Sequence, residues 1–294
     1  MEPSKSPLAI ANACKSYGTT HALKNVSLNV DSGGVIAVLG QNGAGKTTLI
    51  RSAVGLLSLD EGSAHLFGKK SPQRVARERI GIMLQDSDLP ELLTARELVE
   101  LFASYYPDPL SVEATLTLAD INDFAGKRYK QLSGGQKRRV QFALAIVGNP
   151  DLVFLDEPTT GLDPDARRAL WAVVRSFVSD GKTIVLTTHY LEEADTLADR
   201  IVVMREGEVV ADAPATDIRS LLGGSIIRCH TTSSVERLSA LAEVTQVVTS
   251  GRVSEIQTSD VVVTLRELLA PEHEVTDLSV SRPNLEDVFA REYS

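Results

Sequence analysis

The sequence contains, at residues 35–48, the run Val35-Ile36-Ala37-Val38-Leu39-Gly40-Gln41-Asn42-Gly43-Ala44-Gly45-Lys46-Thr47-Thr48. Its first part is apolar and its second part is rich in glycine, which predicts a buried strand followed by a loop and a helix. Residues 40–47 match the phosphate-binding pattern G-x-x-x-x-G-K-[ST]. Glycines let such a loop turn tightly and direct N–H groups at phosphate oxygens, and the helix adds its positive dipole end. We therefore predict that residues 40–48 bind a nucleotide, with Lys46 on the β- and γ-phosphates and Thr47 on Mg²⁺.

Two further apolar runs end in polar residues. Residues 152–155 lead into Asp156-Glu157, and residues 183–186 lead into Thr187-Thr188-His189. Short apolar runs bounded by polar turns are typical of buried parallel strands, and the helical patterns between them complete a layered fold. The fold class predicted is α/β, a P-loop core with a mostly parallel sheet.

Helix signals mark the segments between these strands. Asp163 can cap a helix whose first residue is Pro164, and Gly181 can end it. A second helix is predicted from Ser133 to Gly148. The segment from about residue 90 to 146 interrupts the strand–helix alternation, so we predict a helical insert there.

The chain changes character after Leu222-Gly223-Gly224, which indicates two domains, residues 1–222 and 223–294. The order βαββαβ predicted for the second domain fits a small α+β fold of the split-βαβ type. Its predicted elements are the strand Ile226–Thr231, the helix Val235–Leu241, the strands Val244–Thr249 and Val253–Thr258, the helix Val261–Leu269, the strand Val275–Val280 and a final helix from Asn284.

Composition excludes several classes of protein. The formal net charge of −9 argues against a nucleic-acid binder, which needs a basic face. The two cysteines, Cys14 and Cys229, have no metal-type spacing and are expected to be reduced thiols. We expect no signal peptide at residues 1–6, and no apolar run approaches the roughly 20 residues that span a bilayer. Any membrane role is therefore expected to come through a partner.

The run Leu132-Ser133-Gly134-Gly135-Gln136 narrows the class further. Ser133 and Gln136 can form a capping box, which is a purely structural explanation. Two adjacent glycines weaken a first helical turn, however, and suit a backbone that approaches a phosphate closely. The run resembles the signature sequence of ABC ATPases, and the resemblance extends over about the first 220 residues.

The resemblance implies a role for residues on either side of the P-loop. Tyr17 is similar to the aromatic residue that stacks on adenine, although it also fits an ordinary surface or core tyrosine. Gln85, after the run Ile80–Leu84, resembles the glutamine that reaches Mg²⁺ and the attacking water and links the site to the transport subunit.

The resemblance also implies roles for the polar residues that follow the strands predicted at residues 152–155 and 183–186. It implies that Asp156 holds Mg²⁺, that Glu157 polarises the attacking water and that His189 contacts the γ-phosphate, so Lys46, Glu157 and His189 are the expected catalytic residues. Gly161-Leu162-Asp163 resembles the loop that crosses the dimer interface of the family.

Each of these motifs occurs once in the chain, so two complete sites require two chains. In the family, the signature of one subunit closes on ATP held by the other. The resemblance therefore implies a head-to-tail homodimer in the ATP-bound state, with Ser133 and Gly135 hydrogen-bonded to the γ-phosphate across the interface and Gly134 and Gln136 beside them. ATP and Mg²⁺ are the expected cofactors.

The cellular process that ATP hydrolysis by this chain powers is a separate question. We expect a transporter subunit on the cytoplasmic side of the membrane, bound to a separately encoded permease through Gln85 and residues 86–94. That loop can alternatively be a simple connection. A soluble ABC ATPase acting on DNA or ribosomes is the other class, although this chain has one cassette and no heptad run.

The end of the chain favours export over import. Residues 282–289 resemble the tail of ATP-binding subunits in the drug- and antibiotic-exporter branch. An importer subunit is the alternative, because the same residues also fit an ordinary helix start capped by Asn284.

Overall fold

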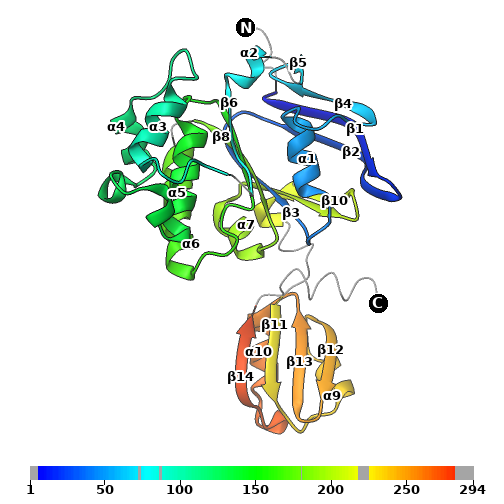
Figure 1. Cartoon of the computed structure of the whole chain (residues 1–294). Coiled ribbons are helices and arrows are strands. Elements are labelled where there is room, and N and C mark those ends of the chain that lie inside the picture. Colours follow the sequence, from blue (N-terminus) through cyan, green and yellow to red (C-terminus); the bar gives the residue numbers. More distant parts are fainter. Residues whose placement is uncertain (1–5, 72–73, 86–87, 180, 218–224, 282–294) are drawn as a thin grey trace. The chain divides into compact units, whose positions relative to one another are not determined.

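The computed structural model describes residues 6–71, 74–85, 88–179, 181–217 and 225–281 (Figure 1). Compact units are formed by residues 1–213 and 214–294. The sequence placed the boundary at residue 222, which is outside the described residues. The predicted helix from Asn284, the exporter-like tail and Asp86 also lie outside them.

The larger unit is built on a six-stranded sheet with the strand order β10-β9-β3-β8-β7-β6. The pairs β3–β8, β3–β9, β7–β8 and β6–β7 are parallel, which confirms the predicted sheet. Its strands are β3 (Gly34–Leu39), β6 (Ile80–Met83), β7 (Leu152–Asp156), β8 (Thr183–Thr188), β9 (Arg200–Arg205) and β10 (Glu208–Pro214).

A second sheet, which the sequence did not predict, has the order β2-β1-β4-β5 and is antiparallel. Its strands are β1 (Leu8–Tyr17), β2 (Thr20–Val30), β4 (Glu61–Leu66) and β5 (Lys69–Lys70). Buried and exposed residues alternate at the end of β2, because one face of this sheet packs on the core.

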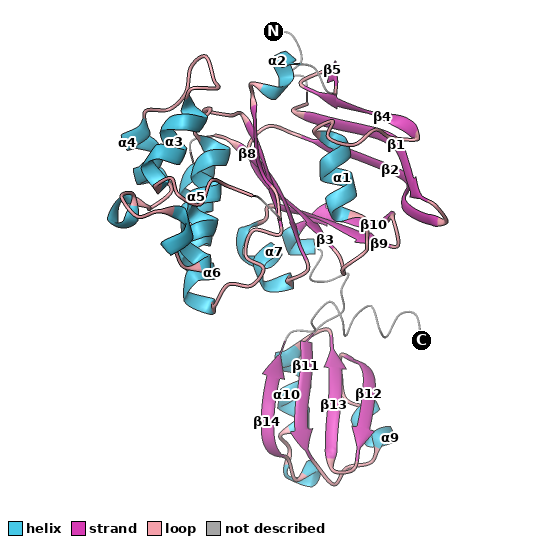
Figure 2. Cartoon of the chain, in the orientation of Figure 1, coloured by secondary structure: helices cyan, strands magenta, loops and turns pink. Residues whose placement is uncertain are grey.

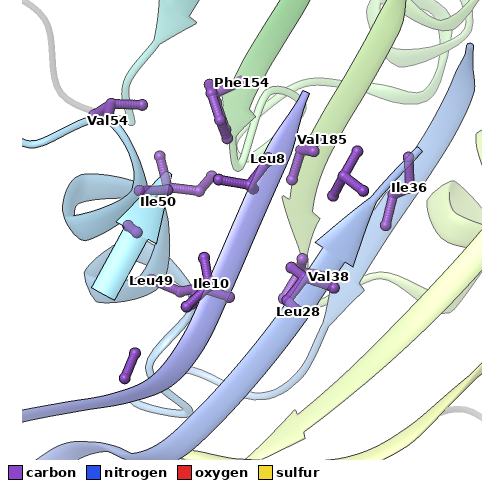
Figure 3. Close-up of a cluster of buried hydrophobic side chains, with 14 of the residues drawn as sticks. Leu8, Ile10, Leu28, Ile36, Val38, Leu49, Ile50, Val54, Phe154 and Val185 are labelled. Atoms are coloured by element: carbon purple, nitrogen blue, oxygen red, sulfur yellow. The ribbon is translucent and has the colours of Figure 1, made fainter. Parts of the chain in front are cut away.

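Helix α1 (Lys46–Ala53) joins the two sheets through one apolar cluster. Figure 3 shows Leu49 and Ile50 of α1 beside Leu8 and Ile10 of β1, with Phe154 of β7 in the same cluster. The helix that follows the P-loop therefore packs against side chains from both sheets.

The helical insert is confirmed, and its helices have clear start signals. Thr94 and Glu97 form a capping box at α3, Ser133 and Gln136 form one at α5, and Asp163 caps α6 through Ala166 N–H at 2.9 Å. Helix α5 ends at Ile146, two residues before the predicted stop. The helices of this unit after α1 are α2 (Arg74–Arg77), α3 (Ala95–Ala103), α4 (Val112–Leu118), η1 (Asn122–Phe124), η2 (Tyr129–Gln131), α5 (Gly134–Ile146), α6 (Pro164–Val178) and α7 (Leu191–Leu197).

The C-terminal unit has the predicted βαββαβ order. Its sheet is antiparallel with the order β12-β13-β11-β14, and Ile227, Cys229, Leu238, Ile256 and Leu268 form its core. Its elements are β11 (Ser225–His230), α9 (Val235–Ser239), β12 (Val244–Ser250), β13 (Val253–Thr258), α10 (Val261–Leu268), η3 (Pro271–His273) and β14 (Thr276–Ser281). In the described parts of the chain, no helix combines the length and the apolar character needed to cross a bilayer.

The contact between β6 and α5 leaves no room for a side chain at Gly81. A Cβ there would lie 1.9 Å from the carbonyl oxygen of Ala145. We expect Gly81→Ala to lower the free energy of unfolding by about 1–3 kcal/mol or more, measured by urea denaturation. Gly126→Ala is the matched control, because a Cβ there meets no atom of the described residues within 4 Å. Equal stability of the two variants would contradict the close packing of β6 on α5.

Candidate active site

Three neighbouring strands, β3, β8 and β7, end at the candidate site. Figure 2 shows their sheet, with β3 and β8 labelled, between the helices α3 to α6 on one side and α1 on the other. The three strands are parallel, so their carboxyl ends meet at one edge of the sheet. The P-loop follows β3, Glu157 follows β7 and His189 follows β8. The three motifs that the sequence singled out separately are thus brought together by the strand order.

The P-loop presents the N-terminal end of α1. Gly45 is the N-cap of this helix, with a φ of 103° and no side-chain hydrogen bond to the first turn. A Cβ at Gly45 would lie 2.3 Å from Ala22 O of β2, so glycine is required by both the dihedral angle and the packing. The N–H groups of the first turn remain available for an anion.

Lys46 is held inside this loop and is 5% exposed. Its Nζ donates to Gly40 O at 2.7 Å and to Gln41 O at 3.0 Å, and it lies 3.1 Å from Glu157 Oε1. The ammonium group is therefore positioned between the P-loop and the end of β7.

Glu157 adopts a left-handed backbone conformation with a φ of 51°. This is uncommon for a glutamate, and such strain is typical of functional sites. Its N–H donates to Thr187 Oγ1 at 3.0 Å, which helps to hold the turn.

The Glu157 carboxylate has three partners. Oε1 pairs with Lys46, and Oε2 accepts from Thr160 Oγ1 at 2.7 Å and lies 2.6 Å from His189 Nδ1. Burial raises the pKa of Glu157, but the hydrogen bond from Thr160, the charge of Lys46 and the other contacts outweigh it, and the net pKa lies below the ordinary value of 4.5. An ionised carboxylate is an acceptor, so His189 Nδ1 is the donor in this pair.

Asp156 is fully buried at the end of β7. Its Oδ1 accepts from Thr47 Oγ1 at 3.1 Å and from Thr187 Oγ1 at 2.6 Å, whereas Oδ2 has no hydrogen-bond partner among the described residues. An orphaned carboxylate oxygen beside a threonine hydroxyl fits a hard cation that prefers oxygen ligands. The residues present therefore fit Mg²⁺.

The other predicted site residues lie elsewhere on the larger unit. Tyr17 ends β1 and is 51% exposed, and Gln85 is exposed, with its carbonyl accepting from Arg138 Nη1 at 3.0 Å. The side chains of Ser133 and Gln136 bond the backbone of each other at 3.3 and 3.0 Å.

The two glycines of the signature differ in their surroundings. A Cβ at Gly135 would lie 2.8 Å from Ala166 Cβ, so packing of α5 on α6 accounts for that glycine. A Cβ at Gly134 would meet only Leu162 Cδ2, at 4.0 Å. The described part of the chain gives no steric reason for glycine at position 134.

The sequence analysis missed two residues of the site, Thr160 and Thr187. Thr187 bonds both Asp156 and the N–H of Glu157, and Thr160 bonds the Glu157 carboxylate. Their only signal in the sequence is their place beside motif residues, because a threonine hydroxyl next to a strand end is too common to mark a site.

Comparisons with known proteins show the family to which the chain is related. The sequence profile of the family described as "ABC transporter" matches residues 23–160, and a profile described as "AAA domain, putative AbiEii toxin, Type IV TA system" matches residues 127–195. The chain is 37% identical to the Nod factor export ATP-binding protein I of Burkholderia lata, over 97% of this chain and 96% of that protein. It is 40% identical to the daunorubicin/doxorubicin resistance ATP-binding protein DrrA of Streptomyces peucetius, over 77% of this chain and 71% of that protein.

Solved structures match the larger unit. The dimeric post-hydrolysis state of the ATP-binding cassette MJ0796, bound to ADP and Pi, aligns with a TM-score of 0.64 at 30% identity. The alignment covers 71% of this chain and 98% of that one. A nucleotide-free ATP-binding cassette from an ABC transporter aligns with a TM-score of 0.66 at 25% identity, over 74% of this chain and 95% of that one.

The lowered pKa of Glu157 predicts a pH dependence of stability. A carboxylate whose pKa falls on folding stabilises the fold above its unfolded value, 4.5, and this contribution is lost as the pH falls through the folded pKa. We expect the midpoint of thermal unfolding of Glu157→Gln, without nucleotide, to lie below that of the wild type at pH 7. The difference should shrink at pH 4 and below.

Glu61→Gln is the control for this measurement, because Glu61 is exposed. Its midpoint should track the wild type at every pH. A constant gap between Glu157→Gln and the wild type from pH 7 to pH 3 would show that the Glu157 charge does not stabilise the fold.

Proposed function

This chain belongs to the ABC transporter ATP-binding family, and from this premise we propose that two copies close head to tail around ATP and drive export through a separately encoded membrane permease. It is an ATP-binding and ATP-hydrolysing subunit. The observation that carries the proposal is the convergence of Lys46, Glu157, His189 and the unpaired Asp156 Oδ2 at one sheet edge. The subunit is placed by this proposal on the cytoplasmic side of the membrane.

Nucleotide binding would use the P-loop as it stands. The free N–H groups of the first turn of α1 would face the phosphates, and Lys46 Nζ would exchange Glu157 for phosphate oxygens. Tyr17 is exposed enough to stack on adenine. Thr47, Asp156 and Gln85 would hold Mg²⁺. The bound ion would neutralise negative charge that develops on the phosphates.

Hydrolysis needs a base and a positioned water. A water oxygen would attack the γ-phosphorus, the bond from that phosphorus to the ADP oxygen would break, and the Glu157 carboxylate would accept the proton of the water. Thr160 and His189 fix Oε2, so Oε1 becomes the free acceptor once Lys46 turns to the phosphates. For His189 to donate from Nε2 to the γ-phosphate while Nδ1 donates to Glu157, both ring nitrogens would have to carry a proton.

The head-to-tail arrangement is supported by the signature. Gly134 leaves open space at the start of α5, where Leu162 Cδ2, at 4.0 Å, is the only atom of the described residues that a Cβ would meet. A backbone without a side chain suits close contact with a phosphate held by a second copy, and Ser133 and Gly135 would donate to it there. A cassette similar to this chain forms a dimer with ADP and Pi.

The direction of transport is supported by the relatives. The Burkholderia lata protein is named for export and the Streptomyces peucetius protein for drug resistance. Their similarity supports an exporter over an importer or a soluble ATPase.

Glu157→Gln should trap the ATP-bound dimer. Removal of the base should lower ATP hydrolysis by about 10²- to 10⁴-fold, while the P-loop still binds ATP and Mg²⁺. Light scattering coupled to size-exclusion chromatography should then show a dimer with ATP and a monomer without it. Glu61→Gln should hydrolyse ATP like the wild type, and a Glu157→Gln protein that stays monomeric with ATP would overturn the scheme.

The loop after Gln85 is our proposed dock for the permease. Asp88 and Leu92 are exposed there, Leu92 by 66%. We expect the double variant Asp86→Lys, Asp88→Lys to reduce co-purification with the permease from detergent-solubilised membranes, with basal ATPase activity unchanged. The double variant Asp108→Lys, Asp123→Lys is the charge-matched control, because both residues are exposed on the helical insert. Normal recovery of the permease with the double variant would rule this dock out.

A further inference from the structure

Two side chains that the mechanism above does not use, Tyr190 and Arg167, lie against His189. The ring centroids of His189 and Tyr190 are 3.9 Å apart, and the ring planes are tilted by 42°. The guanidinium group of Arg167 lies over the Tyr190 ring, with its Cζ 4.5 Å from the ring centroid. A cation in this position is attracted electrostatically by the ring quadrupole. We call these three side chains the His189 cluster.

The His189 end of the cluster joins the proposed base. Nδ1 of His189 lies 2.6 Å from Oε2 of Glu157. A hydrogen bond at one ring nitrogen fixes the position of that atom, but it leaves the plane of the imidazole free to turn. Contact with the Tyr190 ring restricts this turn. The position of Nε2, on the far side of the imidazole, therefore depends on Tyr190.

The other end of the cluster is fixed by two helices. Arg167 is on α6, where its N–H donates to Asp163 O at 3.0 Å. Its side chain is 18% exposed, and Nη1 lies 3.6 Å from Oε2 of Glu192, in the first turn of α7. The backbone between the two rings is also held, because Tyr190 N–H donates to Thr188 Oγ1 at 3.0 Å. The Tyr190 ring is thus a well-supported surface for the imidazole.

We propose that Tyr190 and Arg167 are positioning residues for ATP hydrolysis, which hold the plane of the His189 ring so that it meets both Glu157 and the γ-phosphate. The inference rests on the proposed function, because that function assigns Glu157 as the base and His189 to the γ-phosphate. A misplacement of about 1 Å can lower a rate by about a hundredfold, so a residue that touches neither water nor nucleotide can control the chemical step.

The first test separates positioning from nucleotide binding. Tyr190→Ala should lower kcat for ATP hydrolysis by about tenfold to a hundredfold, because His189 loses the ring that restricts its plane. The Kd for a fluorescent ADP analogue should stay within about twofold, because ADP lacks the phosphate assigned to His189. Tyr190→Phe keeps the aromatic face, so its kcat should stay within about twofold of the wild type.

The second test removes the cation and leaves both rings in place. Arg167→Ala should lower kcat by about threefold to tenfold, the range of a cation–π contact. Arg168→Ala is the matched control and should keep the wild-type kcat, because Arg168 is exposed on the same helix and pairs there with Asp165. All rates are measured below the unfolding transition of each variant. Arg167→Ala tests the inference where Tyr190→Ala does not fold.

A double-mutant cycle distinguishes an effect through His189 from a general structural effect. His189→Ala removes the side chain on which the cluster acts. Adding Tyr190→Ala to it should lower the single-turnover rate by no more than about twofold. Arg167→Ala takes the place of Tyr190→Ala in the cycle if the latter does not fold. Losses that multiply in the double variant would show that the added residue acts elsewhere, and would contradict the proposal.

The outcomes are distinguishable from those of the proposed function. A wild-type kcat in folded Tyr190→Ala or in Arg167→Ala, beside an inactive Glu157→Gln, would overturn this inference alone. An equal loss of kcat in Arg168→Ala would also overturn it. Absence of ATP hydrolysis by the wild type would overturn the proposed function and this inference with it.

Discussion

The ion pair between Lys46 and Glu157 is the contact on which the site depends. Its atoms lie 3.1 Å apart, and both side chains are buried. A buried charge that loses its partner costs several kcal/mol, so the P-loop and the end of β7 must stay in register. In the function proposed above, a triphosphate would compete with Glu157 for the ammonium group of Lys46. Its arrival would free one carboxylate oxygen for water.

The pairing of strands in the six-stranded sheet keeps Lys46 and Glu157 close together. Strands β3 and β7 lie on either side of β8 in parallel pairing, which brings the three polar ends together. The apolar cluster around α1 ties the P-loop helix to both sheets of the unit. Thr187, at the end of β8, then bonds both Asp156 and Glu157 and fixes the turn between them.

The C-terminal unit distinguishes this chain from the MJ0796 cassette. It is included in the similarity to the Burkholderia lata protein, which is named for export. The similarity to the Burkholderia lata protein covers 97% of the chain, whereas the MJ0796 cassette covers 71% of it. The C-terminal unit has its own buried core. Sequence similarity therefore extends beyond the nucleotide site into the part of the chain that simple cassettes do not share.

Features that depend on neighbours in the chain could be predicted from the sequence. The P-loop, the capping box at Ser133 and the βαββαβ order are set by residues within a few positions of each other, where backbone dihedral angles and local hydrogen bonds decide the outcome. The identities of Lys46, Asp156, Glu157 and His189 followed from such local patterns together with the resemblance. The roles assigned to them remain predictions.

Features that depend on distant contacts were decided only by the tertiary structure. The antiparallel sheet, the bonds that Thr187 makes to Asp156 and Glu157, and the contacts of Lys46 and His189 with Glu157 all join segments from different parts of the chain. A threonine or a glutamate has the same local signal on a surface as in a site. Its role is set by the charges and donors that folding brings around it, and these have no fixed spacing in the sequence.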